Sequence, residues 1–160
     1  MQQYIVKIAD MKVVQGTSGI IVTHALGSCI GVAIYDPRAK VGGILHYLLP
    51  ESSLNKAKAQ ANPLTFGDTG IPLLFKEAYA KGANKRSIIV KLAGGAEILE
   101  SKGNFNIGKR NYMIARKLFW KNGVLIRGED VGGTISRSLS LDLATGKVVV
   151  KSPGMGEKVL

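Results

Sequence analysis

The sequence predicts an α+β fold, in which a layered, largely antiparallel β sandwich has two main helices packed on it. Short alternating or β-branched segments bounded by Gly or Pro outnumber the segments with helical periodicity. Many neighbouring segments are joined by short turns, which favours antiparallel pairing. Of the 160 residues, 46% are hydrophobic, which is enough to bury a core. The length predicts one domain covering residues 1–160.

The expected strands are short and spread along the chain. They comprise residues 4–8, 11–14, 19–23, 30–35, 41–49, 87–92, 124–129, 136–141 and 147–151. Residues 36–40 have turn composition, because Pro37 fixes φ and Asp36 can bond the backbone, so they are expected to close a hairpin. Residues 142–146 form a second short connection between the last two strands. The polar segment 51–62 has no apolar period and is expected to be an exposed loop.

The first expected helix begins near Asp68 or Thr69, has Pro72 in its first turn and ends before Gly82. Its buried face is expected to consist of Leu73, Leu74, Ala78 and Tyr79.

The second expected helix begins near Gly108 with Asn106 as its cap, and Gly123 ends it. Apolar side chains recur on it at helical spacing, namely Tyr112, Ile114, Ala115, Leu118 and Phe119.

The chain is strongly basic, with 22 Lys and Arg against 11 Asp and Glu, a net charge of +11. Such a charge favours acidic partners, whether nucleic acid, an anionic membrane surface or an acidic protein. The excess is densest at residues 102–127, which hold basic residues but no acidic one. A solvated helix face explains this run equally well. Aromatic residues make up only 6%, and no interleaved aromatic and basic platform is visible, so no specific nucleic-acid binding is expected.

Other classes of protein are excluded by simple features of the chain. No run of 18 apolar residues occurs, so membrane insertion is not expected, and the first ten residues resemble a strand rather than a secretory signal. One Cys and two His residues cannot form a disulfide or a typical zinc site. We therefore expect a cytoplasmic protein that has no metal and no cofactor.

The single cysteine, Cys29, precedes an apolar strand and could be no more than a small buried side chain. If residues 36–40 close a hairpin, however, the numbers of paired residues sum to about 75 or 76, and Cys29 faces His46 or Tyr47. Opposed side chains lie about 5 Å apart, within reach of a hydrogen bond between thiol and imidazole. A Cys beside a His can form a reactive thiolate–imidazolium pair, with the pKa of the thiol below its free value. The alternative is a core His46 bonded to a backbone carbonyl.

Two further features complete a candidate site for acyl transfer. Gly27 lacks a Cβ, so the chain before Cys29 can adopt a positive φ and direct backbone N–H groups, that of Cys29 among them, toward an oxyanion, with Gly27 and Ser28 as the backbone support. Thr23 ends the preceding strand and could orient the imidazole if the sheet is continuous. Spacing alone favours the alternative that Thr23 is an ordinary strand residue. The glycines of residues 93–96 are expected to let loops pack closely beside the hairpin.

Nearly the whole chain carries a series of short motifs in one order. They are GIIVT (19–23), LGSC (26–29), YDP (35–37), KVGG (40–43), HYLLP (46–50), KLAGGA (91–96), NIGKRN (106–111), EDVGG (129–133) with Arg137, and TGK (145–147). In these motifs and their order the chain resembles the CheD family of chemoreceptor glutamine deamidases. The resemblance implies a Cys–His–Thr triad, which falls on Cys29, His46 and Thr23. It gives no role to His24.

The resemblance also implies a fold and a reaction. The fold is that of the cytotoxic-necrotizing-factor-type deamidase toxins. The reaction converts glutamine side chains of a methyl-accepting chemotaxis receptor to glutamate through a Cys thioester, and some family members also hydrolyse glutamyl methyl esters. A CheC-type phosphatase is the implied partner. The alternative is a largely non-catalytic adaptor that binds and regulates such a phosphatase, although the complete set of Cys29, His46 and Thr23 argues against it.

Overall fold

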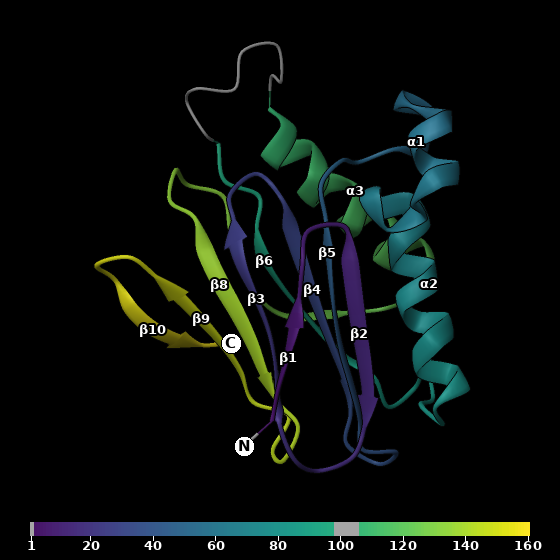
Figure 1. The fold of residues 1–160 in the computed structure, drawn as a ribbon, viewed down its shortest axis with the longest axis vertical. Helices are drawn as coiled ribbons and strands as arrows, with labels where there is room; N and C mark the ends of the chain where they lie inside the picture. The colour runs from purple at the N-terminus through teal and green to yellow at the C-terminus, as the bar shows by residue number, and fades with distance from the viewer. Residues whose placement is uncertain (1, 98–105) are drawn as a thin grey trace.

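The computed structural model describes residues 2–97 and 106–160, which form two five-stranded sheets that face each other (Figure 1). One sheet has the order β1-β3-β8-β9-β10 and the other β2-β5-β4-β6-β7. The strands are β1 (Gln3–Val6), β2 (Asp10–Gln15), β3 (Ile20–Leu26), β4 (Ile30–Asp36), β5 (Val41–Tyr47), β6 (Ile89–Gly94), β7 (Ile126–Val131), β8 (Arg137–Asp142), β9 (Val148–Ser152) and β10 (Gly156–Val159). The α+β class is confirmed.

The helices are α1 (Lys56–Ala61), α2 (Gly67–Ala80) and α3 (Ile107–Lys121), and two 3-10 turns, Ser52–Leu54 and Pro63–Thr65, flank α1. Helices α2 and α3 lie on the outer face of the second sheet, whereas the short α1 contacts the two 3-10 turns beside it (Figure 1). The expected helices correspond to α2 and α3. Asn106 precedes α3, as expected, but it has a φ of 57° and its side chain makes no capping hydrogen bond with the described residues. None of the helices that the structure describes is both long enough and apolar enough to cross a membrane.

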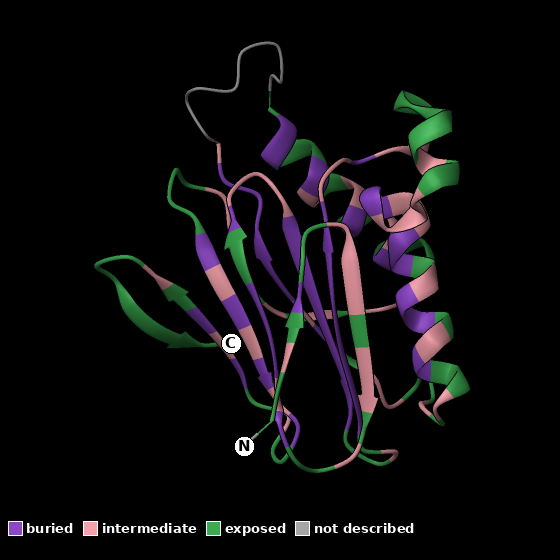
Figure 2. Cartoon of the chain, viewed as in Figure 1, coloured by how far each residue is buried: buried purple, intermediate pink, exposed green. Residues whose placement is uncertain are grey.

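Two apolar clusters fill the space between the layers. β4 shows the division, because its side chains alternate: Val32 and Ile34 pack in the cluster below the helices, whereas Ala33 and Tyr35 pack in the cluster between the sheets. Consequently every residue of β4 and of β5 is buried, and both strands are uniformly purple in Figure 2. The second sheet is therefore the middle layer of three, and its inner face looks onto the first sheet.

Several details differ from the sequence expectations. The β1–β3 and β6–β7 pairs are parallel, so both sheets are mixed although the other six pairings are antiparallel. The segment 51–62 is not a plain loop, because it contains α1, whose N-cap Asn55 accepts a hydrogen bond from the N–H of Lys58. β10 was not expected; its four residues are all exposed and carry no apolar pattern.

Helix α2 differs from the prediction in its first residue, in its cap and in its buried face. It begins at Gly67, directly after Phe66, rather than at Asp68 or Thr69. Asp68 does not cap the helix; its carboxylate accepts hydrogen bonds from Ser52 instead. Tyr79 is 42% exposed, so the expectation that it is buried is wrong.

Candidate active site

The three triad candidates come from both sheets. Thr23 lies in β3 of the first sheet and His46 in β5 of the second, so they meet across the interior of the sandwich rather than within one continuous sheet. Cys29 lies in the connection from β3 to β4, which crosses from one sheet to the other, and packs at the edge of the cluster between the sheets. The route that the chain takes between the sheets thus brings these residues to one end of the inter-sheet space.

A hydrogen-bonded chain fixes the imidazole of His46. Thr23 Oγ1 lies 2.8 Å from the carbonyl oxygen of Val6 and 2.8 Å from His46 Nδ1. A carbonyl can only accept, so the single hydroxyl proton goes to Val6, and Thr23 Oγ1 accepts from Nδ1–H. The neutral imidazole therefore carries its proton on Nδ1, and its Nε2 has a free lone pair. Strand pairing sets this chain up, because β1 and β3 pair Val6 with Thr23.

His46 is held as a neutral base. Its side chain is fully buried, and Nε2 makes no hydrogen bond with any described residue. Burial lowers the pKa of His46 to about 4, and the negative charge of Asp10, its partner in the β2–β5 pair, opposes that shift. At neutral pH the ring is therefore uncharged.

Cys29 differs from His46 in its access to solvent. Its side chain is only half-buried. Burial raises the pKa of the thiol to about 11, and the backbone N–H of Cys29 itself opposes this shift. The expectation of a thiolate–imidazolium pair in the free protein is therefore wrong: desolvation favours a neutral thiol beside a neutral imidazole.

The register of the β4–β5 hairpin also corrects the sequence expectation. Ile30 pairs with Tyr47 and Gly31 with His46, so paired residue numbers sum to 77 rather than 75 or 76. The loop that closes the hairpin runs from Pro37 to Lys40, one residue shorter than the expected loop of residues 36–40, because Asp36 pairs with Val41. Gly31, the residue directly opposite His46, lies two residues after Cys29. Cys29 is therefore diagonal to His46 on the same face of the sheet, and diagonal side chains lie about 7–8 Å apart. A thiol–imidazole hydrogen bond is absent among the described contacts, since Nε2 has no partner.

The backbone before Cys29 is held differently from the expectation. Gly27 does not have a positive φ; Ala25 does, with φ 59°. The carbonyls of Gly27, Ser28 and Cys29 are instead fixed one by one. They accept hydrogen bonds from Ala96 N at 2.9 Å, Asn111 Nδ2 at 2.9 Å and Gly95 N at 2.8 Å, respectively. Among the described residues, the N–H groups of Ser28 and Cys29 donate to no carbonyl.

Close packing at glycines brings the donors Gly95, Ala96 and Asn111 to residues 27–29, which form the Cys29 loop. Such close packing is the expectation for residues 93–96. A Cβ on Gly94 would lie 2.2 Å from the carbonyl oxygen of Cys29, and φ there is +114°. A Cβ on Gly108, in the first turn of α3, would lie 2.4 Å from the carbonyl oxygen of Ala96. Only glycine fits either position, so the start of α3 and the end of β6 can both contact the Cys29 loop.

Asn111 is a site residue that sequence reasoning did not single out. It lies on α3, is fully buried, and its Nδ2 also donates to the carbonyl of Leu48 at 2.7 Å. A polar residue in the middle of an apolar helix face was the available signal. His24, in contrast, is exposed and bonds Ser138 Oγ at 3.0 Å, away from the site.

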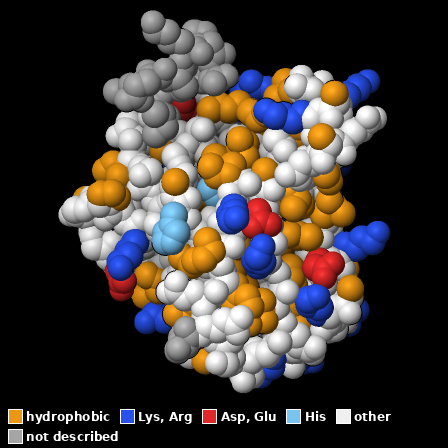
Figure 3. Space-filling model, in the orientation of Figure 1, with side chains coloured by type: hydrophobic (Ala, Val, Ile, Leu, Met, Phe, Trp, Pro, Cys, Tyr) orange, Lys and Arg blue, Asp and Glu red, His pale blue; other side chains and the backbone are white. Residues whose placement is uncertain are grey.

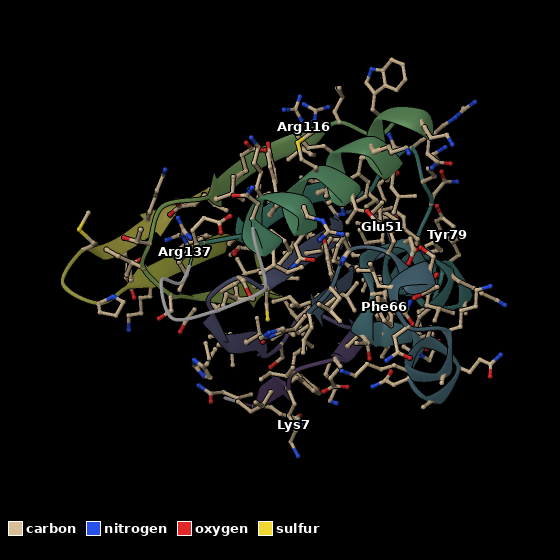
Figure 4. The ribbon with its side chains drawn as sticks, turned by 90° about the horizontal axis from the view of Figure 1, so that it is seen from above. Lys7, Glu51, Phe66, Tyr79, Arg116 and Arg137 are labelled. Carbon is tan, nitrogen blue, oxygen red and sulfur yellow. The ribbon has the colours of Figure 1, made fainter. Side chains whose placement is uncertain are left out.

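Other polar groups around the site have structural partners. Arg137, labelled in Figure 4, donates to the carbonyls of Gly94 and Gly132 and contacts Asp130, so it holds together the loops that follow β6 and β7.

No group of three His, Cys, Asp or Glu side chains within residues 2–97 and 106–160 could hold a metal ion. On the face seen in Figure 3, Lys and Arg are scattered rather than joined in one stripe. Part of the basic run 102–127, Lys102 included, lies outside the described residues.

Comparisons with known proteins decide the family. The model of the family described as CheD chemotactic sensory transduction matches residues 48–152. The chain belongs to the CheD family. A Syntrophus aciditrophicus protein named "Probable chemoreceptor glutamine deamidase CheD 1" is 58% identical over 154 residues, 96% of either chain. CheD proteins with the same name apart from the number come from Solibacter usitatus (44% identical; 100% of this chain, 95% of the relative) and Thermococcus kodakarensis (40% identical; 96% and 95%).

Proposed function

We propose that this CheD-family chain hydrolyses glutamine side-chain amides of a chemoreceptor, the activity for which its relatives are named. The observation that carries the proposal is the state of His46: Thr23 holds its Nδ1–H, and its Nε2 is a buried free base on the face that also carries Cys29. Nucleophile, base and orienting group are the parts that acyl transfer through a thioester needs.

In the first half of the reaction, Cys29 Sγ attacks the amide carbon of the glutamine while His46 Nε2 takes the thiol proton. The imidazolium then gives that proton to the departing nitrogen, so the C–N bond breaks and ammonia leaves. In the second half, His46 Nε2 takes a proton from water, the resulting hydroxide attacks the thioester carbon, and the C–S bond breaks to release glutamate. The imidazolium then returns its proton to Cys29 Sγ, which restores the neutral thiol and the neutral imidazole. Thr23 Oγ1 accepts from Nδ1–H throughout and stabilises the transient imidazolium, supported by Val6.

The electrostatics suit a reaction that begins from neutral partners. Burial keeps the thiol protonated and the imidazole neutral, so charge develops only as the S–C bond forms. His46 must move closer to Cys29, or the reverse, once substrate is bound, and such tightening on binding is common in enzymes. The N–H groups of Ser28 and Cys29 are the proposed oxyanion donors, with Gly27 supporting the turn.

The family resemblance supports three finer proposals. A glutamyl methyl ester would undergo the same steps with methanol in place of ammonia as the leaving group. A CheC-type phosphatase is the proposed protein partner. The two-sheet sandwich with its nucleophile at one end is proposed to match the fold of the cytotoxic-necrotizing-factor-type toxins.

Mass spectrometry of a chemoreceptor cytoplasmic fragment tests the proposed function. Wild-type protein is expected to add about 1 dalton per modified glutamine, because an NH2 group becomes OH, whereas Cys29→Ala and His46→Ala leave the mass unchanged. His24→Ala is the matched histidine control and is expected to act like wild type, since His24 is exposed and bonds only Ser138. Absence of any mass change with wild-type protein, or equal change with Cys29→Ala, would contradict the proposal.

A further inference from the structure

The peptide group between Ser28 and Cys29 has its direction set by a side chain. Three consecutive carbonyls, of Gly27, Ser28 and Cys29, are each fixed by a donor, but only the middle donor, Asn111 Nδ2, is a side-chain atom. In a trans peptide the C=O of one residue and the N–H of the next point in opposite directions. The described chain has no cis peptide, so fixing the Ser28 carbonyl against α3 turns the Cys29 N–H away from α3.

The side-chain amide of Asn111 also lies at the end of the β4–β5 ladder. The last backbone pair of that hairpin joins Ile30 and Tyr47. Beyond it the chain of β5 turns away, because the N–H groups of Leu48 and Leu49 both donate to Thr65 O. Asn111 Nδ2 donates to Ser28 O at 2.9 Å and to Leu48 O at 2.7 Å. One NH2 group therefore links the segment just before Cys29 to the segment just after His46.

The chemistry of this position is specific to an asparagine. Two carbonyls face one fully buried side chain, and among uncharged side chains only the amides of Asn and Gln offer two N–H donors on one nitrogen, of which Asn is the shorter. The reversed amide would place Oδ1 against both carbonyls, and the two hydrogen bonds thus determine which amide atom is nitrogen. Oδ1 itself has no partner among the described residues. A buried acceptor without a hydrogen bond costs free energy of folding. Such a cost is expected where both N–H donors of the same amide are needed to hold the backbone in place.

We propose that Asn111 is a positioning residue that aims the Cys29 N–H at the oxyanion of the acyl-transfer reaction, an inference that rests on the proposed function. Asn111 touches neither thiol nor imidazole; it acts through the Ser28 carbonyl. Loss of its amide frees the Ser28–Cys29 peptide to rotate. Steps that build an oxyanion at the carbon bonded to Cys29 then slow, while the thiol keeps its nucleophilicity.

Two small reagents separate these effects without a receptor. p-Nitrophenyl acetate acylates a thiol through a tetrahedral oxyanion: the S–C bond forms, p-nitrophenolate leaves, and the thiol proton passes to His46 Nε2. Iodoacetamide alkylates the same sulfur by displacing iodide at a CH2 group, and no oxyanion forms. The ratio of acylation rate to alkylation rate at Cys29 therefore reports the oxyanion donor rather than the thiol.

The ratio is measured in wild type, Asn111→Ala and Tyr47→Phe. Tyr47→Phe is the matched control, because it removes another buried hydrogen bond to the same residue, from Tyr47 OH to Asn111 O, and leaves the amide in place. Asn111→Ala is expected to lower the ratio by about 10²-fold, the size of a lost oxyanion donor. Tyr47→Phe is expected to keep the wild-type ratio while its melting temperature falls.

An unchanged ratio in Asn111→Ala, from equal loss of both rates or from no loss, would overturn the inference. If Asn111→Ala does not fold, Asn111→Ser decides in its place, since one hydroxyl can serve at most one of the two carbonyls. A different observation would contradict the proposed function: wild-type protein that is acylated normally by p-nitrophenyl acetate but leaves receptor glutamines intact.

Discussion

Thr23 and His46 are 23 residues apart and belong to different sheets, yet Thr23 Oγ1 and His46 Nδ1 lie 2.8 Å apart in the buried interior. Because Thr23 gives its own proton to Val6, this contact determines which ring nitrogen of His46 is free. The proposed base is thus selected by a strand pairing, β1 with β3, that contains neither Cys29 nor His46.

Thr23→Val is expected to lower kcat by about 10- to 100-fold with little change in KM, a smaller loss than the ~10²- to 10⁴-fold expected of His46→Ala. The isosteric valine cannot accept from Nδ1–H, so the tautomer and orientation of the ring are no longer fixed. Deamidation kinetics on a receptor fragment measure this. Thr23→Ser, which keeps the hydroxyl, is the control and should retain most activity. A larger loss in Thr23→Val than in His46→Ala would contradict an orienting role.

Stability is expected to fall as the pH drops from about 6.5 to about 4, the interval between the ordinary pKa of histidine and that of buried His46. In this interval the unfolded chain binds a proton that the folded His46 refuses, so protonation favours unfolding; above pH 6.5 this contribution is fully present. The expected loss from this group is about 3 kcal/mol. Urea unfolding at several pH values measures it. His46→Gln, which does not titrate, should lose less stability over the same interval; an identical loss would contradict the assignment.

Alkylation of Cys29 by iodoacetamide in the free protein is expected to be slow at neutral pH and to rise above pH 9 toward the thiol pKa of about 11. Burial of the thiol, without an imidazolium to offset it, is the reason. Mass spectrometry of Cys29 labelling across pH gives the profile. Rapid labelling that saturates below pH 8 would show an ion pair with His46 in the resting protein and would contradict the neutral resting state.

Gly94→Ala is expected to abolish activity, because its Cβ would lie 2.2 Å from the Cys29 carbonyl oxygen and must displace the loop that contains Cys29. Gly154→Ala is the matched control: φ is also positive, at +73°, but nothing lies within 4 Å of the added Cβ. Both variants carry backbone strain, and only Gly94→Ala should lose deamidation beyond any loss of stability. Full activity in folded Gly94→Ala would show that the Cys29 carbonyl need not be held there.

The sequence predicted the local elements better than their arrangement. Periodicity and turn residues located α3, both hairpins and most strands, because these signals lie within a few neighbouring residues. The parallel pairing of β1 with β3 joins segments separated by β2, and no local pattern encodes it. The one-residue error in the hairpin loop changed the expected partner of Cys29, since register depends on the loop length.

The site shows the same division. Cys29, His46 and Thr23 could be named from the scarcity of Cys and His and from the family resemblance, and the structure brings Thr23 and His46 into contact. Their protonation could not be predicted, because it depends on burial that only the packed sandwich provides. The hydrogen bond from Asn111 to the Ser28 carbonyl could not be predicted for a similar reason: α3 contacts the Cys29 loop only where glycines allow the close approach.

Trapping a covalent thioester between Cys29 and a glutamine side chain tests the proposed mechanism most directly. Wild-type protein mixed with a receptor fragment and quenched in acid should give an intact-mass species equal to protein plus fragment minus ammonia, with the cross-link at Cys29. Cys29→Ala should give neither this species nor any deamidated fragment. Deamidation of the fragment by Cys29→Ala would contradict the account.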